Sequence, residues 1–117
     1  MSYVDGFVIA VPTAKLEEYW AIARQAGEVW KEFGALTYFE CVADDVPYGE
    51  LTSFPRSVQA KEDETVVFSF VVYASRADRD RIVGKVMEDP RLQTSMENMP
   101  FDTKRMIYGG FTAVVEL

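Results

Sequence analysis

The stretch TVVFSFVVYA, from Thr65 to Ala74, decides the fold of this chain, because both sides of the strand that it predicts are apolar. A strand with one face in water alternates between apolar and polar residues. Here the alternate positions are Val66, Phe68, Phe70, Val72 and Ala74 on one side, and Val67, Ser69, Val71 and Tyr73 on the other. We therefore expect a sheet that is covered on both faces.

Five further elements are predicted around this strand from β-branched runs, helical spacing of aromatic residues, capping residues and glycine stops. In chain order they are the strand Tyr3–Pro12, a helix capped by Thr13 and stopped by Gly34, the strand Ala35–Ala43, a helix capped by Ser75 with Asp78 and ending near Asp89–Pro90, and a last strand from Arg105 to about Val115. The segment Asp44–Ser57 is rich in turn-forming residues, so we expect an irregular excursion there.

This order of elements predicts one α+β domain over residues 1–117 with the ferredoxin-like β-α-β-β-α-β fold. Its four-stranded antiparallel sheet carries both helices on one face, so the other face needs a different cover. A second copy of the same sheet would supply a self-complementary apolar surface, which predicts a homodimer that buries more than about 1,600 Å² in total. The alternative is a monomer in which Asp44–Ala60 folds over its own sheet.

Composition argues against several classes of function. The 117 residues include 19 acidic and 12 basic ones, and the net charge of −7 disfavours a nucleic-acid partner, because phosphate is also negative. We find neither an apolar run of membrane-spanning length nor a charged-then-apolar leader, so we expect a cytoplasmic protein without membrane contact. The single cysteine, Cys41, cannot form an internal disulfide. Histidine is absent, which removes the usual imidazole ligands and bases, so we expect no metal and no organic cofactor.

Five segments resemble the YbaA-like family of bacterial proteins of unknown function, and the resemblance spans essentially the whole chain. The segments are YVDGFVIAVP (3–12), ECVADDVP (40–47), FPRSVQAKEDETVVFSFVVY (54–73), KVMEDPR (85–91) and MPFDTKRMIYGGF (99–111). The resemblance implies membership of the dimeric α+β barrel superfamily, in which the sheets of two ferredoxin-like subunits pair into a barrel. That superfamily includes cofactor-independent monooxygenases, isomerases, haem enzymes and ligand-sensing domains, so it implies no particular reaction.

The last of these segments contains two candidate ligand-binding residues. Arg105 could hold an anion, and Tyr108 could donate a hydroxyl to a ligand. The other interpretation of the segment is architectural. Adjacent glycines such as Gly109 and Gly110 are typical of a bulge or of the close approach of another chain or side chain, and Met99–Asp102 is typical of a rigid turn.

Four further residues are candidates elsewhere in the chain. Arg56 could grip a ligand carboxylate or belong to a surface ion-pair cluster. Asp45 follows Asp44 at a strand end, where the two could share a proton or bind a cation, or could simply open a turn. Trp20 and Trp30 lie on the aromatic stripe of the first helix, which is typical of core packing and could also line a pocket between helix and sheet.

Two functions stay open from the sequence. One is a small-molecule-binding barrel for an apolar or aromatic metabolite, with or without chemistry that needs no cofactor. The other is a non-catalytic module that senses a ligand or contacts a protein. The sequence contains no nucleophile–base pair and no cofactor fingerprint that would separate an enzyme from a binding protein.

Overall fold

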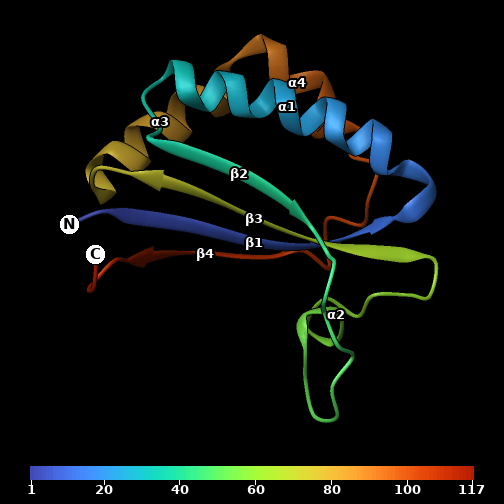
Figure 1. Cartoon of the computed structure of the whole chain (residues 1–117). Coiled ribbons are helices and arrows are strands. Elements are labelled where there is room, and N and C mark those ends of the chain that lie inside the picture. Colours follow the sequence, from blue (N-terminus) through green and yellow to red (C-terminus); the bar gives the residue numbers. More distant parts are fainter.

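A computed structural model of the whole chain, Met1–Leu117, has one antiparallel sheet with a layer of helices on one face (Figure 1). The strand order is β2-β3-β1-β4, and every neighbouring pair is antiparallel, which confirms the ferredoxin-like fold. The elements are β1 (Tyr3–Pro12), the 3-10 turn η1 (Thr13–Lys15), α1 (Leu16–Glu32), β2 (Thr37–Val42), α2 (Phe54–Ser57), β3 (Glu64–Tyr73), α3 (Arg76–Glu88), α4 (Pro90–Glu97) and β4 (Ile107–Thr112).

The helix ends follow local side-chain chemistry, with one exception. Ser75 accepts a hydrogen bond from the backbone N–H of Asp78 at 3.1 Å, which confirms the predicted cap of α3. Gly34 ends the α1 region with a φ of +117°, a conformation that glycine adopts without strain. The prediction that Thr13 caps the first helix was wrong. It lies in η1, where its N–H donates to Asp63 O at 2.8 Å and its hydroxyl bonds to that of Thr65 at 2.8 Å, so both groups contact the start of β3 and do not cap α1.

The core lies between the helices and the side of the sheet that faces them. Helices α1, α3 and α4 bury their apolar stripes there, and none of them is long and apolar enough to cross a membrane. Burial of each large apolar side chain contributes about 1.5–3 kcal/mol relative to exposure. The fully buried members from β3 and the three helices are Tyr73, Val71, Val67, Val29, Ile82, Val86 and Leu92.

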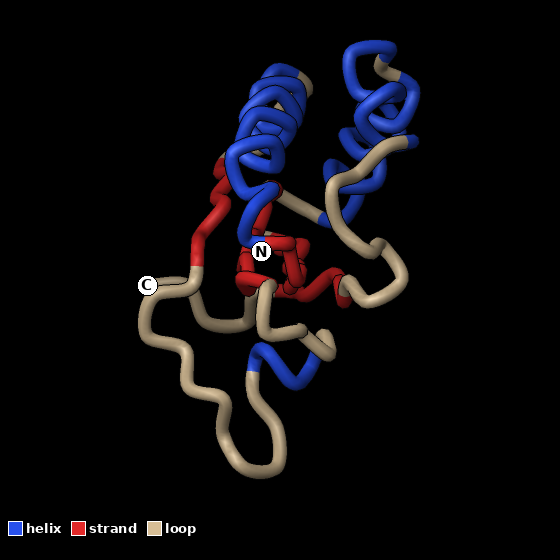
Figure 2. The backbone as a smooth tube through the Cα atoms, turned by 90° about the vertical axis from the view of Figure 1, so that its right-hand side faces the viewer, coloured by secondary structure: helices blue, strands red, loops and turns tan.

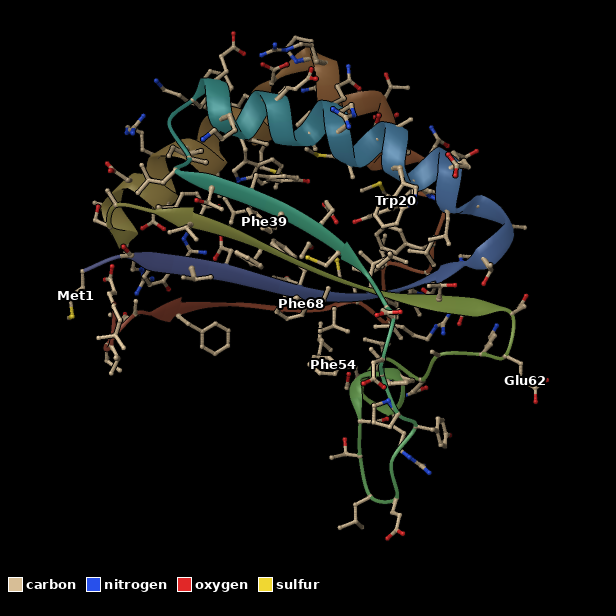
Figure 3. The ribbon with its side chains drawn as sticks, in the orientation of Figure 1. Met1, Trp20, Phe39, Phe54, Glu62 and Phe68 are labelled. Atoms are coloured by element: carbon tan, nitrogen blue, oxygen red, sulfur yellow. The ribbon has the colours of Figure 1, made fainter.

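The opposite face of the sheet is also apolar, as the sequence predicted, and it is covered at one end only. There Val58, which is 1% exposed, packs against β1 and β3. Figures 1 and 2 show the segment that contains α2 projecting away from the sheet on the side without helices, and Figure 3 shows Phe54 and Phe68 on that same side. The large apolar side chains left exposed over the rest of this face are Phe39, Phe68, Ile107 and Phe111.

The last strand is shorter than the predicted Arg105–Val115: its pairing with β1 runs from Val8 with Ile107 to Tyr3 with Thr112, and one further backbone bond joins Ala113 N–H to Ser2 O at 2.9 Å. Within β4, Gly110 lies against the ring of Tyr3. A Cβ on Gly110 would come within 2.9 Å of the Tyr3 ring, whereas one on Gly109 would only touch Phe111 at 3.5 Å. Gly110, and not Gly109, therefore marks a close approach of a side chain, which is one of the architectural interpretations of the sequence.

We expect Gly110→Ala to lower the free energy of unfolding by about 1–3 kcal/mol, because the new methyl group overlaps a buried aromatic ring. Gly109→Ala is the matched control, one residue away in the same strand, and should change it by about 0.5 kcal/mol or less. Urea unfolding of the two variants checks this. Equal losses would contradict the assignment of the close contact to Gly110.

Candidate functional site

A mostly apolar pocket of about 170 Å³ lies between the helices and the sheet. Of its 18 lining residues, 15 are hydrophobic, and the three others are Glu40, Ser69 and Ser95. Helix α1 contributes Ala26 and Trp30 to one wall, and β1 contributes Phe7 to the floor. Concave apolar sites with a few convergent polar groups are typical of small-molecule binding.

Methionines form much of the wall opposite α1. Four of the five methionines of the chain line the pocket, namely Met87, Met96, Met99 and Met106. They come from α3, from α4 and from the segment that leads into β4. Because the methionine side chain is unbranched and flexible, such a wall adapts its shape to a ligand more readily than a wall of branched residues.

The polar wall is built around the carboxyl group of Glu40, in the middle of β2. Tyr19 of α1 donates a hydrogen bond to its Oε1 at 2.9 Å, and Tyr38 donates to its Oε2 at 2.7 Å. Ser69 lies opposite Glu40 in the β2–β3 pairing, and its hydroxyl adds a third favourable interaction. The side chains of Glu40 and Tyr38 share one face of β2 because they are two residues apart.

Burial raises the pKa of Glu40 above its usual value, and the hydroxyl groups of Tyr38, Tyr19 and Ser69 offset only part of that shift. The two phenols shift as well. Burial first, and then the charge of Glu40, raise the pKa of Tyr19 and of Tyr38 far above the ordinary value, so both stay protonated and remain donors. A perturbed carboxyl group in a cleft is a physical indication of a functional site.

Glu40 and Tyr38 also line a second, open groove between α1 and β2, together with Arg24, Glu28 and Lys31. The carboxyl group thus stands between the apolar pocket and a charged groove that is open to solvent. Gly27 makes this arrangement possible, because a Cβ there would lie 2.7–2.8 Å from the ring of Tyr38. The glycine in the middle of α1 lets the tyrosine ring pack directly against the helix backbone.

A second buried polar cluster supports the pocket next to Trp30. The indole Nε1 of Trp30 donates to Tyr73 Oη at 2.9 Å, and Tyr73 donates to Asp5 Oδ2 at 2.9 Å. Arg79 closes the chain through a 3.1 Å contact from its Nη1 to Asp5 Oδ1. This buried carboxylate has both a cation and a hydroxyl partner, although Arg79 Nε is buried without a hydrogen-bond partner of its own. The cluster is therefore a structural network that fixes the orientation of Trp30.

The structure places Arg105 outside this pocket, in a dense set of intramolecular contacts. Its guanidinium group forms a two-pronged ion pair with Glu64, at 2.7 and 2.6 Å, and also contacts Asp102 at 3.0 Å. A further bond to Gln59 O at 2.8 Å ties it to the end of the α2 segment. Arg105 thus connects the start of β3, the excursion and the approach to β4. The side chain of Tyr108 is 72% exposed on β4 and stacks on Phe7 at 6.3 Å.

The remaining candidate residues lie in three places. Arg56 holds the excursion together by donating to Tyr48 O at 3.0 Å and Gly49 O at 3.2 Å, with its guanidinium over the Tyr48 ring. Asp45 is exposed in the same excursion. Trp30 lines the apolar pocket, and Trp20 lines the open groove from the sheet side of α1 (Figure 3).

Of the six predicted residues, only Trp20 and Trp30 therefore line a cavity that Glu40 also lines, Trp30 in the apolar pocket and Trp20 in the open groove. No group of three or more Cys, Asp or Glu side chains is placed to hold a metal ion. Sequence reasoning missed Glu40 and Tyr38, whereas Tyr19 belongs to the aromatic stripe that was expected to pack in the core or line a pocket. Two signals could have identified Glu40 and Tyr38: an ionisable residue in the middle of the strand YFECV on its helix-facing side, and the mid-helix Gly27.

The two glutamates predict opposite pH dependences of stability. In Glu40 the folded-state pKa is raised, so ionisation opposes folding, and its contribution to stability decreases as the pH rises above about 4.5 toward that raised pKa. Glu40→Gln should therefore become progressively more stable relative to the wild type as the pH rises through this window. Urea unfolding between pH 3 and 8 measures the difference.

Glu64→Gln is the contrasting variant. The hydrogen bonds from Arg105 lower the pKa of Glu64 to about 2, so its stabilising contribution is present above about pH 4.5 and is lost as the pH falls toward 2. At pH 7 this variant should lose about 1.5–3 kcal/mol of unfolding free energy, the usual range for hydrogen bonds to a charged group. Parallel pH profiles for the two variants would show that the two carboxyl groups do not differ in this way.

Comparison with known proteins places the chain in a family. Residues 2–103 match the family model described as "Protein of unknown function (DUF1428)". The chain is 51% identical over 116 residues to the "Uncharacterized protein YbaA" of Escherichia coli (strain K12), with 99% of each chain covered. The same identity and coverage hold for YbaA of Shigella flexneri.

Solved structures share the fold at low sequence identity. A provisionally assigned antibiotic biosynthesis monooxygenase from Nitrosomonas europaea is similar with a TM-score of 0.66 at 15% identity, covering 97% of this chain and 90% of the other. A NIPSNAP family protein from Agrobacterium tumefaciens gives 0.61 at 21% identity, covering 96% and 92%. A dimeric ferredoxin-like protein from an uncultured marine organism gives 0.65 at 10% identity, covering 99% and 98%. These likenesses concern the fold alone, whereas the match along the sequence shows that the chain belongs to the DUF1428 family, together with YbaA.

Proposed function

We propose that this protein binds a small, mainly apolar ligand in the pocket between α1, α4 and the sheet. The observation that carries the proposal is the Glu40–Tyr38–Tyr19 cluster in the wall of an otherwise apolar pocket. An apolar cavity of about 150 Å³ accommodates benzene in another protein, so a pocket of about 170 Å³ fits a body of one aromatic ring. Chemistry at this site would consist of proton transfer to or from Glu40, which needs neither a metal nor an organic cofactor.

The assembly that we propose is a homodimer through the sheet face without helices. On this face Phe39 and Phe70 stack at 5.0 Å, and the next positions across the sheet are the paired glycines Gly6 and Gly109. A ridge of two phenyl rings beside a glycine hollow is a shape that can fit a twofold-related copy of itself. The dimeric ferredoxin-like protein of similar fold agrees with such an assembly.

A second candidate function is a non-catalytic module that contacts a protein through the excursion. Leu51 at its tip is 96% exposed, and the neighbouring Tyr48 and Phe54 are also exposed. Three exposed apolar side chains on a projecting segment are typical of an interaction surface. Ligand binding in the pocket distinguishes the two functions, because the small-molecule-binding function requires it and the protein-contact function does not.

Filling the pocket tests the binding function. We expect Ala26→Phe to abolish the binding of toluene, because the new ring occupies the space of the ligand. Ala21→Phe adds the same ring to an exposed position of α1 and should leave binding unchanged. Ligand-observed NMR titration measures both. Retention of binding in Ala26→Phe would locate the ligand elsewhere.

Charge at the sheet face tests the assembly. We expect Phe39→Arg to raise the dimer dissociation constant by at least about 30-fold, which corresponds to the loss of one central interface side chain of about 2 kcal/mol. Phe39 is half-exposed in the single chain, so the monomer should keep its fold. Ala77→Arg adds the same charge to an exposed position of α3 as a control. Sedimentation velocity distinguishes the two states, and an unaffected dimer, or a monomeric wild type, would contradict this interface.

A further inference from the structure

The Glu40 carboxylate has room for one more hydrogen-bond donor. A carboxylate offers about four acceptor positions. Tyr19 and Tyr38 occupy one position on each oxygen, at 2.9 and 2.7 Å, and Ser69 interacts with the group as well. Because Glu40 lines the pocket, a ligand in the pocket can contact the carboxyl group and use the position that remains.

Apart from the hydroxyl of Ser95, the hydrogen-bond donors around the pocket are already in use. The hydroxyl groups of Tyr19 and Tyr38 are donated to Glu40, and the indole N–H of Trp30 is donated to Tyr73. The hydroxyl of Ser95 is the remaining polar group of the lining, and it can donate one hydrogen bond, but it is neutral. A ligand that offers only an acceptor is limited to this donor, unless it displaces one of the bonds above. The free hydrogen-bonding capacity of the pocket is therefore mainly that of an acceptor.

The charges around the pocket reinforce this preference. No lysine or arginine lines it, and Arg24 and Lys31 line the outer groove instead. A ligand carboxylate inside the pocket would lie near Glu40 without a counter-charge, in surroundings where such an unpaired charge is costly. A hydroxyl group or a protonated amine would instead complete the hydrogen bonding of Glu40.

We propose that Glu40 is the polar anchor for a one-ring ligand that carries a hydroxyl or amine donor, and that the pocket rejects the corresponding carboxylate. This inference rests on the proposed function and specifies the ligand class of the same site. Glu40 acts here as a binding residue, and the inference does not depend on whether a reaction follows.

Four probes of similar size test the proposal on the wild-type protein at pH 7.5: toluene, benzyl alcohol, benzylamine and benzoate. Isothermal titration calorimetry should show benzyl alcohol or benzylamine binding at least about 10-fold more tightly than toluene, as expected for one hydrogen bond to a charged group. Benzoate should bind more weakly than toluene. The order of benzyl alcohol and benzylamine shows whether the natural donor is neutral or cationic.

Glu40→Gln should reduce the advantage of the donors over toluene to about 3-fold or less, and should relieve the discrimination against benzoate. Glu28→Gln is the matched control, because it removes the same charge from the outer groove and not from the pocket. It should keep the wild-type order of affinities. If Glu40→Gln does not fold, as judged by its melting transition, the wild-type order decides by itself.

The outcomes separate the two proposals. If toluene binds and the donors gain nothing over it, or if benzoate binds as well as benzyl alcohol, the anchor role of Glu40 is wrong while the binding pocket stands. If Glu28→Gln changes the order as much as Glu40→Gln does, the preference comes from overall charge and the anchor role is again wrong. If none of the four probes binds at millimolar concentration, both this inference and the proposed function are wrong.

Discussion

The antiparallel pairing of β1 with β3 is the constraint on which the rest of the structure depends. It joins ten residue pairs from Tyr3 with Tyr73 to Pro12 with Glu64, and the other two strands add to its edges. Because side chains alternate between faces, this one register sends Asp5 and Ser69 toward the helices and Phe70 to the opposite face. A slip of one residue would exchange the two faces and bring the phenyl rings under the helices.

The carboxylates of Asp5, Glu40 and Glu64 differ in the groups that stabilise their negative charge. Asp5 is paired with Arg79, and Glu64 is paired with Arg105, as is usual for buried charges. Glu40 instead receives only hydroxyl groups, and burial raises its pKa. Glu40 is therefore the one carboxyl group of the three that has no cationic partner, and it lies in the wall of a pocket. Such local departures from good packing rules concentrate at functional sites.

The shared fold and the local chemistry carry different information here. The NIPSNAP and monooxygenase-like structures have the same arrangement of strands and helices at 15–21% identity, so the fold by itself is compatible with several functions. The local features of this chain that bear on function are the methionine-rich wall, the Gly27 contact with Tyr38 and the carboxyl group of Glu40. The function has to be argued from that combination.

The sequence by itself determined the order of the elements, the caps at Ser75 and Gly34, and the apolar character of both sheet faces, because each depends on neighbours within a few residues. Only the tertiary structure decided which polar side chains meet. Tyr19 reaches Glu40 from 21 positions away, and Arg105 reaches Glu64 from 41 positions away. Those contacts depend on how α1 crosses β2 and how the approach to β4 passes the start of β3. For that reason the sequence indicated Arg105 as a possible anion-binding residue and did not indicate Glu40. In the structure Arg105 is engaged in intramolecular ion pairs, and Glu40 lines the pocket.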